Sequence, residues 1–303
     1  MSDGARRSDS AAPENLATLA SELEGRIRGY GASRALVAFS GGVDSATILA
    51  LAARALGSES VTAITAVSPS YPDGELVRAR ALALSLGVVH QAITTPEVYL
   101  ESYARNDALR CMHCKTVVYS ALSRLAAEIA DDGTGVVVLA GSNLDDTGEF
   151  RPGLLAAAQF RIGSPFLEEG VGKAQVRALA RHFGLAVADK PALACLSSRV
   201  AYGIRISPSL LARIDRAEQE VRRLGFEAVR VRHFGTRAVV EVPLADVARL
   251  LDHPGLVRLK SRMAALGWTE VSVDPEGYRA GRMNESLPET AKASVHATSL
   301  GIE

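Results

Sequence analysis

Short apolar runs alternate with longer amphipathic stretches along the first two thirds of the chain. The runs ALVAFS, VTAITAV, GVVHQAI and GVVVLAG begin at residues 35, 61, 87 and 135, and β-branched residues are frequent in them. Between the runs, apolar residues recur with helical spacing, as in SATILALAARALG and KTVVYSALSRLAAEIA. The runs predict strands and the intervening stretches predict helices. Their strict alternation predicts an α/β fold, a doubly wound parallel sheet with helices on both faces.

The pattern changes after about residue 200. A polar helical stretch, SPSLLARIDRAEQEVRRLG, precedes two strand-like runs in AVRVRHFGTRAVVEV, with a Gly-Thr turn between them. A helical stretch around 245–266 and a last strand, WTEVSVD, follow. This α-β-β-α-β order predicts a smaller C-terminal α+β domain, with a role in substrate binding or oligomerisation.

Both ends of the chain lack periodicity. Residues 1–14 and 286–303 are rich in small and polar residues, which predicts disordered tails. We therefore expect a large α/β domain over residues 15–200 and the smaller domain over residues 201–285.

Composition narrows the class of protein. The chain has 303 residues, of which 48% are hydrophobic and 22% charged, and its 34 Lys and Arg residues balance its 34 Asp and Glu residues. A balanced charge gives no overall field toward nucleic acid or a membrane surface. The N-terminal residues lack the apolar core of a secretory signal, and no segment approaches the roughly 18 apolar residues of a membrane span. We expect a cytoplasmic protein that binds neither nucleic acid nor membrane.

The stretch SGGVDS, residues 40–45, lies between the first strand and the first helix of the α/β pattern. Gly41 and Gly42 permit a tight turn, and Ser40 and Ser45 add hydroxyl groups. The dipole of the following helix contributes about half a positive charge at its N-terminus. These features predict a phosphate site, although Gly, Ser and Asp are also common in plain strand-to-helix turns. The motif lacks the Lys and the spacing of a Walker A loop.

SGGVDS in this position resembles the PP-loop of the ATP pyrophosphatases. The resemblance implies ATP as a cofactor, with the β,γ-pyrophosphate held by the loop while a substrate oxygen attacks the α-phosphate and becomes adenylated. Asp44, together with Asp145 and Asp146 after the strand at 135–140, supplies oxygen ligands suited to Mg²⁺. Asp145 and Asp146 are equally suited to capping a helix. Their place at the carboxyl end of a strand favours the Mg²⁺ interpretation.

The chain has three cysteines, an odd number that argues against a disulfide framework and leaves free thiols or a metal site. Cys111 and Cys114 form a CxxC motif, and Cys195 follows much later in KPALACLSSR. Three thiolates are able to ligate three irons of a [4Fe–4S] cluster and leave the fourth iron open to carry a sulfide. Buried structural cysteines, a Cys₃His zinc site with His113 and a CxxC redox pair are the alternatives.

Longer motifs resemble the LarE family of ATP-dependent sulfurtransferases. They are CMHCKTVVYSAL, LDDTGEFRPG, RIGSPF, KPALACLSSRVAYG and EGYRAGRMNE, and the resemblance extends from about residue 15 to 285. It implies that the chain adenylates the carboxylates of pyridinium-3,5-biscarboxylic acid mononucleotide and converts them to thiocarboxylates. This reaction belongs to the biosynthesis of the nickel-pincer nucleotide, the cofactor of lactate racemase. The resemblance also implies a homo-oligomer, and it leaves the sulfide donor unidentified.

Members of this family differ in their cysteines. Some carry only the cysteine equivalent to Cys195 and sacrifice its sulfur in one turnover, which leaves dehydroalanine. Others also carry the CxxC motif and hold an iron–sulfur cluster that delivers a bound sulfide. Because this chain has Cys111, Cys114 and Cys195, we predict the cluster type, with Cys195 as a ligand.

The remaining predicted site residues fall into three groups. Cys195, Asp44 and Lys115 are the predicted catalytic residues, Lys115 as a contact of the phosphate or the adenylated carboxylate, or alternatively as a solvated lysine. The other two groups are the predicted contacts of the nucleotide with Mg²⁺ and the predicted contacts of the substrate. Nucleotide and Mg²⁺ contacts are predicted for Ala38, Ser40, Gly41, Gly42, Val43, Asp44, Ser45, Ser68, Asp145 and Asp146, and contacts with the substrate phosphate for Arg199, Arg230 and Arg232. Arg230 and Arg232 alternate with valines and fit a solvated strand face equally well. Glu241 and Asp274 have little support as metal or interface residues.

Three other functions stay open on the sequence. A PP-loop tRNA thiolation enzyme would share the loop and the cysteines, but the chain lacks a Lys/Arg-rich stripe for a phosphate backbone. A non-catalytic adenine-nucleotide-binding protein would need neither the cysteines nor the paired aspartates. An amidotransferase-type synthetase would need an ammonia source that this chain does not encode.

Overall fold

The computed structural model describes residues 13–130, 135–148, 151–191, 194–279 and 281–287. They form two compact units. Of the described residues, those within 13–66, 74–95 and 115–191 belong to unit 1, and those within 67–73, 96–114 and 194–287 belong to unit 2. The expected boundary at residue 200 differs from this division, because two earlier segments pack with the C-terminal part of the chain. Most residues of the expected tails lie outside the described residues, but α1 already begins at Pro13 and Leu287 is buried.

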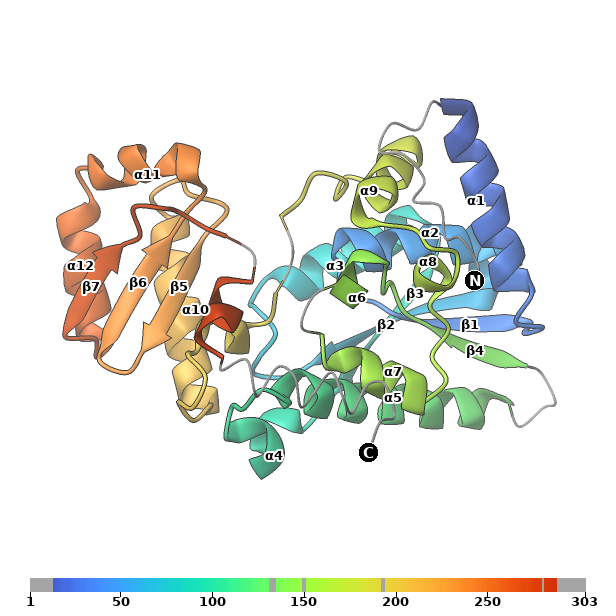
Figure 1. The fold of residues 1–303 in the computed structure, drawn as a ribbon, viewed down its shortest axis with the longest axis horizontal. Helices are drawn as coiled ribbons and strands as arrows, with labels where there is room; N and C mark the ends of the chain where they lie inside the picture. Colours follow the sequence, from blue (N-terminus) through green and yellow to red (C-terminus); the bar gives the residue numbers. More distant parts are fainter. Residues whose placement is uncertain (1–12, 131–134, 149–150, 192–193, 280, 288–303) are drawn as a thin grey trace. The chain divides into compact units, whose positions relative to one another are not determined.

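Unit 1 is built on a four-stranded sheet. Its strands are β1 (Arg34–Ala38), β2 (Val61–Val67), β3 (Val89–Thr94) and β4 (Val136–Leu139), in the order β3-β2-β1-β4 (Figure 1). β1 pairs in parallel with β2 and with β4, in registers that place Ala35 beside Val61 and Val137. The predicted doubly wound α/β fold is confirmed. Since the strand order reverses at β1, the carboxyl ends of β1 and β4 form the switch point at which such folds bind ligands.

Helices cover both faces of this sheet. α1 (Pro13–Arg28), α2 (Val43–Leu56) and α9 (Lys173–His182) lie on one face, and α5 (Arg110–Ile129) and α7 (Gly153–Gln159) lie on the other (Figure 1). The remaining elements are η1 (Ser58–Ser60), α3 (Glu75–Ser85), α6 (Asp145–Gly148) and α8 (Pro165–Glu168). α2 is the most deeply buried helix of the core, and Ile48, Leu49 and Leu51 have no exposed surface. This burial fixes the position of the residues at its N-terminus.

Unit 2 contains a three-stranded sheet, β5 (Arg230–Phe234), β6 (Arg237–Glu241) and β7 (Glu270–Val273), in that order. β5 and β6 form the predicted hairpin around Gly235 and Thr236, and β7 pairs in parallel with β6. The other elements are η2 (Glu97–Tyr99), α4 (Glu101–Ala104), η4 (Leu196–Arg199), α10 (Pro208–Arg222), α11 (Leu244–Leu251), α12 (Leu256–Ala265) and η5 (Arg282–Ser286). The single helix expected around 245–266 is two helices, because Pro254 and Gly255 interrupt it.

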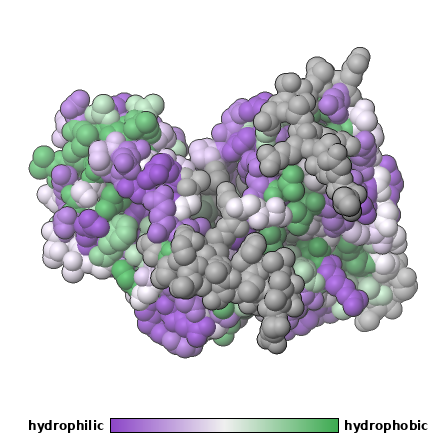
Figure 2. All heavy atoms as spheres, in the orientation of Figure 1, coloured by the Kyte–Doolittle hydropathy of each residue, from purple (hydrophilic) through white to green (hydrophobic). Residues whose placement is uncertain are grey.

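The surface of the described residues is mixed. Figure 2 shows hydrophilic residues over α4, where the exposed Glu101 pairs with Arg205 at 2.6 Å. Hydrophobic residues gather over α11 and α12, where Leu244, Leu251 and Val257 are exposed (Figure 2). No helix in the described part of the chain has the length and apolar character needed to cross a membrane.

Candidate functional site

The loop between β1 and α2 has the geometry of an anion site. Gly41 adopts a φ of +77°, and a Cβ there would lie 3.3 Å from the Cβ of Ala79, so a side chain is unfavourable. Gly42 is the N-cap of α2 and provides no side-chain cap, which leaves the first N–H groups of the helix available to an anion. The hydroxyl of Ser45 accepts from the main-chain N–H of Ser40 at 3.2 Å and donates to the Gly42 carbonyl at 3.1 Å. Hydrogen bonds between residues of the loop therefore brace its conformation.

The loop after β4 comes close to this loop. A Cβ at Gly141 would lie 2.7 Å from the carbonyl carbon of Asp44, so only glycine allows the observed approach. The side-chain amide of Asn143, which is 2% exposed, donates to Asp44 Oδ1 at 3.4 Å. Residues 40–45 and 141–146 thus meet at the switch point of the sheet, where the sequence placed the candidate Mg²⁺ ligands.

Asp145 and Asp146 also have structural partners. The main-chain N–H of Asn143 donates to Asp146 Oδ2 at 3.0 Å, and Arg151 pairs with Asp146 Oδ1 at 3.2 Å. Asp145 accepts from the main-chain N–H of Lys173 at the start of α9. The two bonds from main-chain N–H groups are capping interactions, and the role of either aspartate in binding Mg²⁺ stays a prediction.

Lys173 is a site residue that the sequence interpretation missed. It is the first residue of α9, and its ammonium group pairs with Asp44 Oδ2 in the phosphate loop. A cation in the first turn of a helix opposes the helix dipole. The sequence offered one indication of this residue: Lys173 directly follows Gly172, the N-cap of α9, and a lysine there is near the positive end of the helix dipole.

The three cysteines all belong to unit 2. Cys111 and Cys114 lie in the first turn of α5, and their spacing of three residues places them on the same side of the helix. Cys195 directly precedes η4. Arg110, which directly precedes Cys111, is buried. It donates to the carbonyl of Ser197 at 3.1 Å and lies 5.2 Å from the ring centroid of Tyr202.

The electrostatics of this region connect the three sulfur atoms. Burial by itself would lower the pKa of Arg110, but its neighbours Cys111 and Cys195 raise it above the usual value. Burial raises the pKa of Tyr103, and the charges of Cys195 and Cys114 add to that effect. The three thiols therefore act on shared neighbours. In the described part of the chain, no three His, Cys, Asp or Glu side chains already stand close enough together to bind one metal ion.

Buried hydrogen bonds fasten the segment before Cys111 to the segment after Cys195. The side-chain amide of Asn106 donates to the carbonyls of Ala201 and Ile204, both at 2.8 Å. The Tyr103 hydroxyl donates to Ser197 Oγ at 2.6 Å. Since Asn106 has no exposed surface, these bonds hold the two segments together without competition from water.

Ser68, predicted to border the adenosine, lies in unit 2. Its hydroxyl is 2.9 Å from that of Ser70, whose carbonyl accepts from the Leu196 N–H at 2.8 Å. This chain of bonds supports the Cys195 segment. Ala38 is the last residue of β1, and Lys115 is exposed with its ammonium 5.3 Å from the ring centroid of Tyr119. No geometry tests the roles predicted for these three residues.

The three predicted phosphate-binding arginines lie in different environments. Arg199, 1% exposed, donates to Glu218 Oε1 at 2.8 Å and to the carbonyl oxygens of Ala194 and Cys195 at 2.6 and 2.8 Å. This geometry ties it to the backbone around Cys195. Arg232 is also buried and donates to Glu241 Oε2 at 2.9 Å, so the strand face that carries it is not solvated.

Arg230 differs from the other two arginines. Its guanidinium lies 5.3 Å from the ring centroid of Tyr278. Burial, followed by the positive charge of Arg199, lowers its pKa to about 10. An anion such as a phosphate would offset both effects. Elsewhere in unit 2, Asp274 pairs with Arg282, and Glu241 pairs with Arg232. Both acidic residues are therefore partners in ion pairs.

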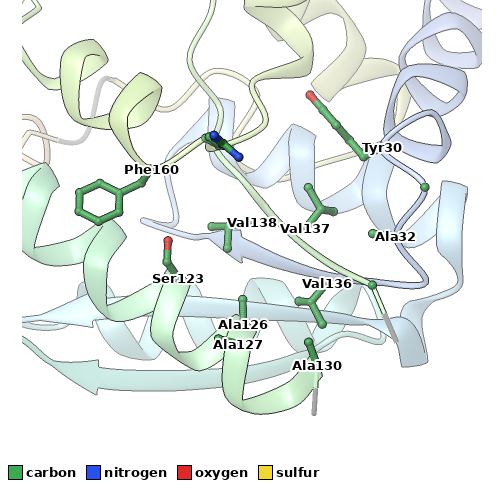
Figure 3. A pocket seen from close by; sticks show the side chains of 13 residues that line it. Tyr30, Ala32, Ser123, Ala126, Ala127, Ala130, Val136, Val137, Val138 and Phe160 are labelled. Atoms are coloured by element: carbon green, nitrogen blue, oxygen red, sulfur yellow. The ribbon is translucent and has the colours of Figure 1, made fainter. Parts of the chain in front are cut away.

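A groove of about 430 Å³ lies along β4 in unit 1 (Figure 3). Figure 3 shows Val136, Val137 and Val138 of β4 beside Ala126 and Ala127 of α5 and near Tyr30. None of the predicted site residues lines this groove. It extends toward Gly31 and Ala32, which precede β1, whereas the phosphate loop follows β1. The groove is therefore separate from the candidate nucleotide site.

Comparison with known proteins adds an independent line of evidence. The family model of NAD synthase matches residues 15–115. An uncharacterized protein of Synechocystis is 38% identical over 270 residues, which cover 89% of this chain and 99% of that protein. The pyridinium-3,5-bisthiocarboxylic acid mononucleotide synthase of Lactiplantibacillus plantarum is 34% identical over 261 residues, 86% of this chain and 92% of the relative. The tRNA-specific 2-thiouridylase MnmA of Bradyrhizobium diazoefficiens is 29% identical over 210 residues, only 56% of this chain and 50% of that enzyme.

Proposed function

Since the chain belongs to the LarE family of pyridinium-3,5-bisthiocarboxylic acid mononucleotide synthases, which are ATP-using PP-loop sulfurtransferases, we propose that it forms the thiocarboxylates of that nucleotide. The substrate is then pyridinium-3,5-biscarboxylic acid mononucleotide, and the product serves as a precursor of the nickel-pincer nucleotide. The observation that carries the proposal is the set of buried hydrogen bonds that joins the segment before Cys111 to the segment around Cys195, in a chain that also has a phosphate loop held by its own hydrogen bonds.

The first step is activation of a carboxylate. Sulfur cannot displace oxide from a carboxylate, because oxide is a very poor leaving group. In the proposed reaction a carboxylate oxygen attacks the α-phosphorus of ATP, and the bond to pyrophosphate breaks. The N–H groups at the start of α2 and the hydroxyls of Ser40 and Ser45 hold the departing pyrophosphate. Gly41, Gly42 and Val43 contribute main chain to the same cradle, and Ala38 and Ser68 are retained as the predicted adenosine neighbours.

Mg²⁺ fits the donor set beside this loop. Asp44 carries a carboxylate at the N-terminus of α2, and Asp145 approaches the same residue, Lys173, from the other loop. Carboxylate oxygens are the ligands that Mg²⁺ prefers, and the ion neutralises charge on the phosphates of a nucleotide. Asp44 and Asp145 would hold the ion, and Asp146, bound to Asn143 and Arg151, would support that loop.

The second step is transfer of sulfur to the acyl carbon. A sulfide attacks this carbon, the bond to the adenylate oxygen breaks, and AMP leaves with the electron pair. A [4Fe–4S] cluster held by Cys111, Cys114 and Cys195 would supply that sulfide at its open iron. A cubane distributes its ligands over different irons, so its three thiolates do not have to converge on one metal ion. Arg110, buried beside Cys111, supplies positive charge to the thiolates.

Arginine side chains recognise the phosphate of the substrate in this proposal. Arg230 is retained as a predicted contact of this phosphate; it is partly buried, and its guanidinium lies 5.3 Å from the ring centroid of Tyr278. Arg199 and Arg232 act by positioning the backbone around Cys195 and Ser198. Lys115 is retained as a predicted contact of the adenylated carboxylate. A homo-oligomer, which the family resemblance implies, and a cytoplasmic location, which we expect from the sequence, complete the proposal.

Iron and sulfide analysis tests the cysteine assignment. The wild-type protein, Cys111→Ala and Met112→Leu are purified without oxygen and reconstituted with iron and sulfide. About four irons and four acid-labile sulfides per chain in wild type and Met112→Leu, with loss in Cys111→Ala, would support a cluster. A wild-type protein that binds no iron would refute the cluster. Loss of sulfur from Cys195 after one turnover, detected by mass spectrometry, would then identify it as a sacrificial donor.

Product analysis tests the substrate. Release of AMP and pyrophosphate is measured with pyridinium-3,5-biscarboxylic acid mononucleotide and, separately, with unmodified tRNA. Stimulation by the mononucleotide, with sulfur in the product, supports the proposal. Stimulation by tRNA alone would identify a tRNA thiolation enzyme, and no stimulation by either would favour a non-catalytic nucleotide-binding protein.

A further inference from the structure

Lys173 joins the two aspartates that the proposed function assigns to Mg²⁺. Its ammonium group pairs with Asp44 Oδ2, and its main-chain N–H donates to Asp145 Oδ2. The other Asp44 oxygen accepts from Asn143 at 3.4 Å. The side chains of Lys173 and Asp44 are 31% and 29% exposed, so the ion pair is open to exchange with solutes.

The position of this lysine in α9 is unfavourable by itself. Lys173 is the first helical residue after the N-cap Gly172, and the first turn of α9 contains no acidic residue. The positive end of the helix dipole repels an ammonium group there. Negative charge from Asp44 and Asp145 offsets that repulsion in this structure, and a bound pyrophosphate would offset it as well.

We propose that Lys173 holds the cation position at Asp44 while no nucleotide is bound, and exchanges that partner for the β,γ-phosphates when Mg²⁺ enters with ATP. The proposal rests on the nucleotide site of the proposed function and adds one residue to it. A lysine suits such an exchange, because its charge is a compact point on a flexible four-carbon chain and binds phosphate without a fixed geometry. After exchange, Asp44 coordinates the metal and Lys173 neutralises the leaving pyrophosphate.

The exchange predicts a difference between nucleotides. AMP lacks the β- and γ-phosphates, so its affinity should not depend on Lys173. The affinity of ATP with Mg²⁺ should fall about tenfold or more in Lys173→Met, which corresponds to about 1.4 kcal/mol. In the absence of nucleotide, Mn²⁺ as a probe should bind Lys173→Met more tightly than wild type, because the competing ammonium is gone.

Calorimetry with ATP and AMP, and electron paramagnetic resonance of free Mn²⁺, measure these affinities. Lys190→Met is the matched control, because Lys190 forms a comparable pair with Glu75 at 2.6 Å and is 25% exposed. It should leave all three affinities unchanged. Lys173→Arg keeps the charge and should retain more ATP affinity than Lys173→Met, and circular dichroism verifies that each variant is folded.

Three results would overturn the inference. They are wild-type ATP affinity in Lys173→Met, an equal loss of AMP and ATP affinity, and Mn²⁺ binding that is unchanged by the substitution. Each concerns binding alone and leaves the proposed sulfur transfer untouched. Absence of sulfur transfer in a protein that shows the predicted ATP selectivity would instead refute the proposed function and leave the role of Lys173 intact.

Discussion

The buried ion pair between Arg199 and Glu218 gives the sharpest prediction about stability. Their side chains are 1% and 0% exposed. Replacing Arg199 with Met leaves the charge of Glu218 in an apolar interior, and loss of one partner of a buried pair costs about 3–5 kcal/mol. Glu218 keeps its bonds to Arg222 at 2.9 Å and to the Val231 N–H at 3.1 Å. We therefore expect the free energy of unfolding to fall by about 3 kcal/mol, the lower end of this range.

Urea unfolding followed by tryptophan fluorescence measures this loss. The single tryptophan, Trp268, is 1% exposed and belongs to the same unit as Arg199, so its emission reports the unfolding of unit 2. With a denaturant slope of about 2 kcal/mol per molar urea, the midpoint should fall by about 1.5 M. Arg205→Met is the control, because Arg205 and Glu101 are 63% and 70% exposed and such pairs contribute about 0–1 kcal/mol.

The pH dependence tests the same reasoning. Burial alone would raise the pKa of Glu218, but Arg199, together with Arg230 and Arg222, outweighs burial, and the pKa is lowered in the folded protein. Its contribution to wild-type stability is therefore present above the unfolded pKa and lost as the pH falls through the folded pKa. In Arg199→Met, the carboxylate of Glu218 has lost its main partner, and protonation removes that charge, so the deficit should shrink as the pH falls. A deficit below about 1 kcal/mol, or one independent of pH, would refute the argument.

Two further substitutions test the phosphate loop and the core of unit 2. Gly141→Ala should push the loop of Asp44 away and weaken ATP binding about tenfold or more by calorimetry. Gly148→Ala, where a Cβ meets no atom within 4 Å, should bind ATP normally, and equal affinities would contradict the close approach. Burial lowers the pKa of His233 to about 4, so the unfolded chain binds more protons between about pH 4 and 6.5 and stability should fall on acidification through that window. His233→Gln keeps an acceptor for the Trp268 N–H and should flatten this slope in urea titrations at pH 5 and 7, and an unchanged slope would exclude His233 as its source.

Local sequence patterns were sufficient for the strands, for the main helices between β1 and β4, and for the main motifs. The alternation of apolar runs and amphipathic stretches predicted β1 to β4 and the helices between them, and the Gly-Thr turn predicted the hairpin of β5 and β6. Such patterns succeed because hydrogen bonds within a helix or hairpin join residues close in sequence. SGGVDS predicted the braced turn into α2 for the same reason. Pro254 and Gly255 are residues that interrupt helices, so the sequence did indicate the break between α11 and α12. We nevertheless expected one helix, because apolar residues recur with helical spacing on both sides of them.

Only the tertiary structure decided which distant residues meet. The sequence contains Lys173 and Asp44, but their ion pair depends on α9 and α2 packing on the same face of the sheet. The sequence also left Arg199 as a candidate phosphate ligand, whereas the packing of α10 against η4 supplies Glu218 as its buried partner. Contacts of this kind arise from the shape and burial of whole elements, which no local period encodes. The sequence thus determined the chemistry that this protein carries, and the fold decided which charges compensate one another.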